Sequence, residues 1–233
     1  MKFKGKHYVK KADLKEDGFQ QFIEKTVEAY YRDRQKFWIG GAVALVEIVG
    51  IILLLQSRQP SGVNPKAEVA MTQAVGIYST GNMAQAETAF KDVASRFGRD
   101  FAGAKAHYYL ANVYYSTGRF NEARAEFAKF LGRVKNDPLL SPASQFGVGN
   151  CEEQLGNNLP AAQAYAAVPK RWPKSPMAFD ADMAAARCYR NAGAYDKAQA
   201  VYEKLLKDKE IGQKGEEVKT QLAYMQALQK KFQ

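Results

Sequence analysis

Hydrophobic residues follow two different patterns along the chain, and the first is a continuous run near the N-terminus. Residues 37–55, FWIGGAVALVEIVGIILLL, contain a single charged residue, Glu47. About 20 apolar residues in a helix cross the roughly 30 Å hydrocarbon layer of a bilayer, and Phe37 and Trp38 stand at one end, where aromatic rings favour the interface. The run therefore predicts a transmembrane helix over residues 37–56 rather than a buried core helix. Because no small-x-small cleavage site follows it, we expect a retained anchor and not a signal peptide.

One narrow stripe of this predicted helix carries small residues together with the carboxyl group. A small-xxx-small pair lets another helix approach closely, and a carboxyl group at mid-membrane costs ~3 kcal/mol, so it usually faces protein. We therefore predict that the stripe docks a helix of another membrane protein or of a second copy of this chain. A protonated Glu47 tolerated in lipid is the alternative. The stripe consists of Gly40, Ala44, Glu47 and Ile51.

The residues before the run predict a basic tail followed by an amphipathic helix, together residues 1–36. Apolar residues recur at three- and four-residue spacing over residues 19–37, and their stripe either lies in the lipid interface or packs on a partner protein. Close to the run, four Lys and Arg residues precede it (Lys25, Arg32, Arg34 and Lys36) and two follow it within a similar distance (Arg58 and Lys66). The positive-inside rule then predicts a cytoplasmic N-terminus and a C-terminal part on the other side of the membrane.

The second pattern is a repeat with a period of 37 or 38 residues, which begins after a linker over residues 57–66. A glycine marks each copy, with a small residue seven positions before it, alanine five after it and an aromatic residue nine after it. Each glycine is expected to end one helix and to permit a tight turn into the next. The glycines are Gly81, Gly118, Gly156 and Gly193; the small residues are Ala74, Ala111, Gly149 and Ala186; the alanines are Ala86, Ala123, Ala161 and Ala198; the aromatic residues are Phe90, Phe127, Tyr165 and Tyr202.

This frame resembles the tetratricopeptide repeat (TPR) family over roughly residues 67–207. It departs from the family pattern in its longer period and at Asn158, where an aromatic residue is expected. The resemblance implies an all-α fold, in which one N-terminal transmembrane helix precedes an α-solenoid of about four TPR-like hairpins. The amphipathic segment 214–231 is expected to cap the open end of the stack. The repeat domain would then span residues 67–233.

The resemblance also implies a partner-binding groove on the first helices of the hairpins. Two asparagines with basic neighbours resemble the carboxylate-binding grooves of the family, and a generic solvated groove is the alternative. The positions that correspond to the groove are Lys105, Tyr108, Asn112, Tyr115, Asn150, Arg187 and Arg190.

The charge of the chain suggests an anionic partner or a diffuse basic surface. The net charge is +10, but the basic residues are scattered and form no stripe with interleaved aromatic residues, so no nucleic-acid partner is expected. No catalytic or phosphate-binding motif is present, and His107 has no evident acidic or cysteine partner in the sequence. We therefore expect neither an enzyme nor a metal site, cofactor or small-molecule substrate.

The two cysteines, Cys151 and Cys188, occupy equivalent positions in neighbouring repeats. Helices stacked one repeat apart lie about 9–10 Å from each other, whereas a disulfide requires Cα atoms within about 7 Å. We therefore predict two buried free thiols.

The order of the segments resembles the YfgM-type inner-membrane proteins, which carry periplasmic TPRs on a single-span anchor. That resemblance implies the bacterial inner membrane, a cytoplasmic N-terminus, a periplasmic repeat domain and an accessory role at the protein translocon or in periplasmic chaperoning. The alternative is a structural subunit of a respiratory, photosynthetic or secretion complex. In both cases the expected partners are proteins, and at least one of them is a membrane protein.

Overall fold

The computed structural model separates the chain into two compact units, Met1–Ser57 and Arg58–Gln233. In the first unit, the described residues are helical, and the longest uninterrupted stretch of them is 45–52. Glu47 and Ile51 lie in this stretch with exposed side chains, whereas Gly40 and Ala44 lie outside the described residues. Among the helices that the structure describes, none combines the length and the apolar character needed to cross a bilayer. The structure describes residues 21, 23, 25–27, 30, 31, 38, 42, 45–52, 64–208 and 211–231.

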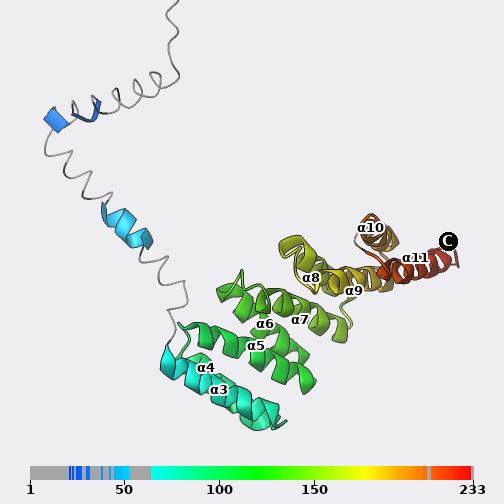
Figure 1. The fold of residues 1–233 in the computed structure, drawn as a ribbon, viewed down its shortest axis with the longest axis horizontal. Helices are drawn as coiled ribbons and strands as arrows, with labels where there is room; N and C mark the ends of the chain where they lie inside the picture. Colours follow the sequence, from blue (N-terminus) through cyan, green and yellow to red (C-terminus); the bar gives the residue numbers. More distant parts are fainter. Residues whose placement is uncertain are drawn as a thin grey trace, which may run out of the picture. The chain divides into compact units, whose positions relative to one another are not determined.

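The second unit is a stack of helical hairpins (Figure 1). Within residues 64–208 and 211–231 the hairpins pair α3 with α4, α5 with α6, α7 with α8 and α9 with α10, and α11 packs against α10. The expected four hairpins are therefore confirmed, and a further helix follows them. The helices are α3 (Pro65–Ser79), α4 (Met83–Arg96), α5 (Phe101–Ser116), α6 (Phe120–Arg133), α7 (Leu140–Gln154), α8 (Asn158–Arg171), α9 (Ala178–Asn191), α10 (Tyr195–Leu206) and α11 (Lys214–Lys231).

The repeat glycines form the turn inside each hairpin. All four have a positive φ, between 72° and 81°, a backbone conformation that costs most L-residues roughly 1–2 kcal/mol. Each glycine N–H donates to the carbonyl oxygen three residues earlier, for example Gly81 to Tyr78 at 3.0 Å. Asn82, the next residue, caps α4 by accepting a hydrogen bond from the Gln85 N–H at 3.1 Å. The role that the sequence frame predicts for the glycines is therefore confirmed.

Small and aromatic positions of the frame pack against one another within a hairpin. A Cβ atom on Gly149 would lie 2.6 Å from the ring of Tyr165, so the absence of a side chain lets α7 and α8 approach closely. In the first hairpin, Ala86 and Phe90 are both fully buried. Phe90 stacks on Tyr109 of the next hairpin, with 5.4 Å between ring centroids. In these hairpins the small position lets the two helices approach, and the aromatic position of the first hairpin also contacts the next one.

The surroundings of the buried cysteines agree with the sequence prediction, whereas those of the buried histidine do not. Cys151 and Cys188 are free and buried, and burial raises the pKa of each thiol to about 12. The expectation that His107 has no acidic partner is wrong, because its Nδ1 lies 2.5 Å from Oε2 of Glu126. The acid comes from α6, the second helix of the same hairpin, so spacing along α5 alone could not reveal it.

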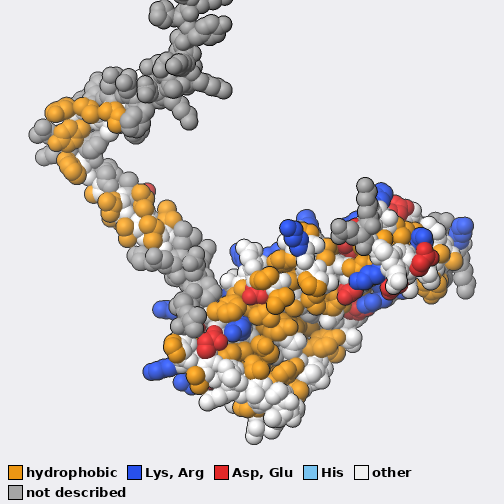
Figure 2. Space-filling view, in the orientation of Figure 1, with side chains coloured by type: hydrophobic (Ala, Val, Ile, Leu, Met, Phe, Trp, Pro, Cys, Tyr) orange, Lys and Arg blue, Asp and Glu red, His pale blue; other side chains and the backbone are white. Residues whose placement is uncertain are grey.

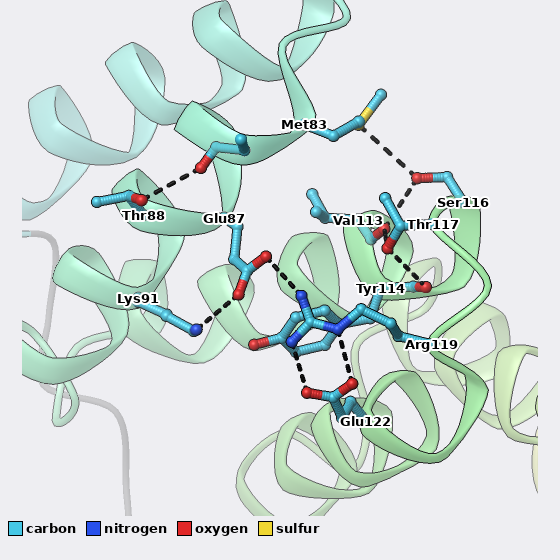
Figure 3. A network of polar contacts seen from close by, with 11 residues as sticks. Met83, Glu87, Thr88, Lys91, Val113, Tyr114, Ser116, Thr117, Arg119 and Glu122 are labelled. Atoms are coloured by element: carbon cyan, nitrogen blue, oxygen red, sulfur yellow. Dashed lines mark hydrogen bonds and ion pairs between the residues drawn. The ribbon is translucent and has the colours of Figure 1, made fainter.

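A polar network joins the first two hairpins (Figure 3). Arg119, directly after a repeat glycine, pairs with Glu87 of α4 at 2.7 Å and donates from Nε to Glu122 of α6 at 2.6 Å. Its guanidinium also lies 4.1 Å from the ring centroid of Tyr114. Lys91, which donates to the Glu87 carboxylate at 2.6 Å, holds the pKa of Glu87 below its ordinary value together with Arg119. The network fixes the register of one hairpin on the next.

Candidate protein-binding cleft

A cleft of about 470 Å³ opens in the second half of the stack, between residues of α5, α7, α8, α9 and α11. Figure 2 shows hydrophobic side chains spread over the middle hairpins, and charged side chains gathered toward α10 and α11. The cleft combines both kinds of surface. Its aromatic side chains are Tyr115, Phe146, Tyr165 and Phe179, and its charged side chains are Glu153, Asp180, Arg187 and Glu217.

Glu153 organises the polar wall of the cleft. The Arg187 guanidinium, one hairpin further along, donates to both carboxylate oxygens, with Nη2 2.8 Å from Oε2 and Nε 3.1 Å from Oε1. The Tyr165 hydroxyl lies 2.9 Å from the same carboxylate and 2.6 Å from Oδ1 of Asn150. These contacts join α7, α8 and α9, and they use two of the three guanidinium nitrogens of Arg187, Nε and Nη2.

The ionisation of Glu153 depends on this arrangement. Burial by itself raises the pKa of the carboxyl group, but the hydrogen bonds from Arg187 and Tyr165 outweigh it and hold the pKa below the ordinary 4.5. Burial and the adjacent carboxylate both raise the pKa of Tyr165, so the phenol stays protonated. The polar wall is therefore a fixed arrangement of an anion, a cation and a neutral donor.

The lowered pKa of Glu153 predicts a pH dependence of stability. The pKa of this carboxylate is lower in the folded than in the unfolded state, so its ionisation stabilises the fold. This stabilisation is fully present above the unfolded-state pKa, here 4.5, and is lost as the pH falls through the folded-state value. The Glu153→Gln variant should therefore be less stable than the parent at neutral pH, and this difference should shrink as the pH falls below 4.5. Urea unfolding at several pH values measures it. The exposed Glu203→Gln variant is the control; a Glu153→Gln deficit that is constant with pH contradicts the prediction.

Three of the seven groove residues implied by the TPR resemblance meet in this cleft: Tyr115, Asn150 and Arg187. The other four do not line it. The Lys105 ammonium lies 3.3 Å from Glu68 of α3, and the Asn112 side chain donates to the backbone carbonyl of Tyr108 in its own helix.

The remaining two of these residues also make contacts inside the fold. Tyr108 packs its ring against Phe127 and Phe130. Arg190 donates to Gln221 at 3.2 Å and lies over the ring of Tyr224. The basic residues that the resemblance placed in the groove are therefore all engaged with neighbouring side chains.

Several cleft residues were not anticipated from the sequence. Asp180 and Met183 precede Arg187 by seven and four positions, which places them on the same helical face, and Glu153 follows Asn150 by three. The spacing rule applied to the predicted residues could have found these. Glu217 comes from α11, outside the repeat frame, and no repeat signal indicates it. Across the described part of the chain, no group of three or more His, Cys, Asp or Glu side chains is arranged to hold a metal ion.

Comparison with solved structures identifies the fold. The TPR-like repeats of a kinesin light chain candidate from Podosopora anserina superpose with a TM-score of 0.53 and 14% identity, over 71% of this chain and 87% of that chain. A single-substitution variant of the same protein gives a TM-score of 0.49 and 14% identity, over 71% and 97%. At this identity the first likeness establishes a TPR-like fold and nothing about function. No curated protein matches the chain.

Comparison with protein families gives a more specific relationship. The model of the family described as "T7SS, ESX-1 secretion system protein EccA1, N-terminal domain" matches residues 56–224, which include all of the described helical hairpins. This family differs from the YfgM-type proteins that the order of segments resembles. Because the match covers well over half of the sequence, the chain belongs to the family of the N-terminal domain of the ESX-1 secretion system protein EccA1.

Proposed function

We propose that this chain is a non-catalytic protein-binding module that holds a protein partner in the cleft as an accessory subunit of a secretion-associated membrane assembly. The observation that carries the proposal is the cleft itself, to which the last three hairpins and α11 all contribute side chains. Clefts that combine apolar surface with a few placed polar groups are the usual form of binding sites. The TPR-like fold, a stack in which neighbouring repeats present a continuous surface, supports a protein partner.

The pairing within the cleft supports binding rather than catalysis. Glu153, Tyr165 and Arg187 satisfy one another. A catalytic acid or base would need a pKa close to the operating pH, whereas the pKa of Glu153 is lowered and that of Tyr165 is raised. The hydrogen-bonded set of Glu153, Tyr165 and Arg187 thus fixes the shape of the cleft.

The family relationship favours secretion over the other roles considered. EccA1 is described as a protein of the ESX-1 secretion system, and this supports a secretion assembly over a respiratory or photosynthetic complex. It also favours a secretion assembly over an accessory role at the general translocon.

Membrane attachment through residues 37–56 is part of the proposal, with the N-terminus cytoplasmic and the repeats periplasmic at the bacterial inner membrane. Its support is the composition of the run and the exposure of large apolar side chains along the helical residues 45–52. Leu45, Val46 and Ile48 are 64%, 69% and 57% exposed. In this arrangement the stripe that contains Glu47 docks a membrane partner.

Site-directed photo-crosslinking in the native cell tests the proposal. A photoreactive phenylalanine analogue at Phe179, in the cleft, should give a discrete adduct with a component of a secretion system, identified by mass spectrometry. The adduct should remain with membranes after an alkaline wash. The same analogue at Leu139, which is 67% exposed and outside the cleft, should give no such adduct. The same adducts from both positions would contradict binding in the cleft. An adduct that the wash releases from the membranes would contradict the anchor.

A further inference from the structure

Some charged side chains of the cleft are paired within the fold, and others are unpaired and can contact a partner. Three carboxylates and one guanidinium line it, and the guanidinium of Arg187 is bound by Glu153 through both oxygens. Within the described residues, the carboxylates of Asp180 on α9 and Glu217 on α11 have no hydrogen bond or ion pair. Both side chains are exposed. Among its lining residues, the cleft therefore presents two unpaired carboxylates, whereas its one cation, Arg187, is paired with Glu153.

This balance is opposite to that of the chain as a whole, whose net charge is +10. It is also opposite to what a carboxylate-binding groove requires, because such a groove needs unpaired cations. Lys105 pairs with Glu68, Arg187 with Glu153, and Arg190 donates to Gln221. The basic residues that suggested carboxylate recognition are thus used to hold the hairpins together.

The apolar part of the cleft complements a long cationic side chain. Phe146, Phe179 and Met183 are half-buried and lie beside the free carboxylates. Lysine and arginine place their methylene stems on apolar surface while the charged end stays at a wet rim, and aromatic faces attract cations. The chain already shows this contact, because the ammonium of its own Lys214 lies 4.2 Å from the ring centroid of Phe179.

We propose that the cleft selects an extended protein segment that carries Lys or Arg beside apolar residues, with the cation between Asp180 and Glu217 and its stem on Phe179. This inference rests on the proposed protein-binding function of the same cleft. The partner's cation competes with Lys214 for the aromatic face. Recognition is therefore expected to weaken when the two carboxylates are neutralised, and to strengthen when Lys214 is.

Fluorescence anisotropy with the full chain in detergent micelles tests this selectivity. The probes are three labelled peptides of equal length, in which leucine and alanine alternate with lysine, glutamine or glutamate. The lysine peptide should bind roughly tenfold more tightly than the glutamine peptide, the size expected of two solvent-exposed ion pairs, and the glutamate peptide should bind most weakly. These differences should disappear at about 0.5 M salt, where exposed charges are screened.

Four variants make the result specific to the cleft. The double variant Asp180→Asn/Glu217→Gln should lose the roughly tenfold preference for lysine, and Lys214→Gln should bind the lysine peptide a few-fold more tightly. Glu203→Gln neutralises one carboxylate on α10, outside the cleft, and should leave the preference unchanged. Phe179→Ala should weaken binding of the lysine and the glutamine peptide, and of the lysine peptide more, because its cation also loses the aromatic face.

The proposal is overturned if the glutamate peptide binds as tightly as the lysine peptide, or if the double variant keeps the preference. Equal binding of the lysine and glutamine peptides, both weakened by Phe179→Ala, would refute the selectivity and leave the protein-binding function standing. Absence of binding by all three peptides, together with absence of crosslinks from Phe179, would refute both.

Discussion

Replacing Gly103 with alanine is expected to lower the free energy of unfolding of the repeat domain by about 3 kcal/mol, at the upper end of the range for overpacking. A Cβ atom at this position would lie 2.0 Å from the carbonyl oxygen and 2.5 Å from the carbonyl carbon of Phe97. These are backbone atoms, so no side-chain rotation can relieve the contact. The loop between α4 and α5 would have to move, although Phe97 and Asp100 are both held in it by backbone hydrogen bonds.

Urea unfolding followed by circular dichroism measures this effect, and Gly76→Ala is the matched control. Gly76 lies inside α3, and a Cβ atom there would meet nothing within 4 Å. Alanine should therefore stabilise α3 by about 0.5–1 kcal/mol through its higher helix propensity. If the two variants differ by less than about 1 kcal/mol, the close approach of α5 to this loop does not constrain the fold.

Replacing Phe90 with alanine is expected to cost about 3–5 kcal/mol, the range for removing a fully buried aromatic side chain. Phe90 is 0% exposed. It stacks on Tyr109 of α5 and packs edge-on against Tyr78 of α3, with centroids 5.4 Å and 6.1 Å away. The substitution would leave a cavity between the first two hairpins.

Denaturant unfolding measures the loss, and hydrogen exchange locates it. Because stability in a repeat stack is a sum of local and nearest-neighbour terms, protection should fall in α3, α4 and α5 and persist in α9 and α10. Tyr224→Ala, at an aromatic residue that is 53% exposed, should cost less than about 1 kcal/mol. A uniform loss of protection would show that the stack unfolds as one unit, and equal losses of stability in the two variants would contradict the expected effect of burial.

The repeat domain was predictable because its signals are local. The four glycines indicate their turns without any tertiary information, since a positive φ depends mainly on the residue itself. The separation of the two cysteines followed from the repeat period, and both thiols are free. The first repeat helix, α3, begins at Pro65, two residues before the expected start of the repeat domain, because Asn64 caps α3 and Pro65 occupies its first turn, a combination that favours a helix start.

The cleft was predicted only in part because its chemistry depends on contacts between hairpins. Spacing along α7 and α9 places Asn150 and Arg187 on their helical faces, but the partner of Arg187 is Glu153, which lies 34 positions away. Which cation meets which carboxylate depends on the register of neighbouring hairpins and on side-chain rotamers, neither of which is encoded in a local pattern. The resemblance to carboxylate-binding grooves carries no information about these pairings. Gly40 and Ala44, outside the described residues, remain predictions.

The way each helix packs mainly on its neighbours in sequence also bears on how the domain reaches its structure. Contacts between segments close in the chain require the closure of short loops only, and proteins of this kind fold in microseconds to milliseconds. A hairpin of this stack has its main partners available as soon as the next hairpin has been synthesised, so folding can proceed from α3 onward while the ribosome is still adding α9 to α11. The repeat domain is therefore expected to leave little unfolded chain exposed during its synthesis.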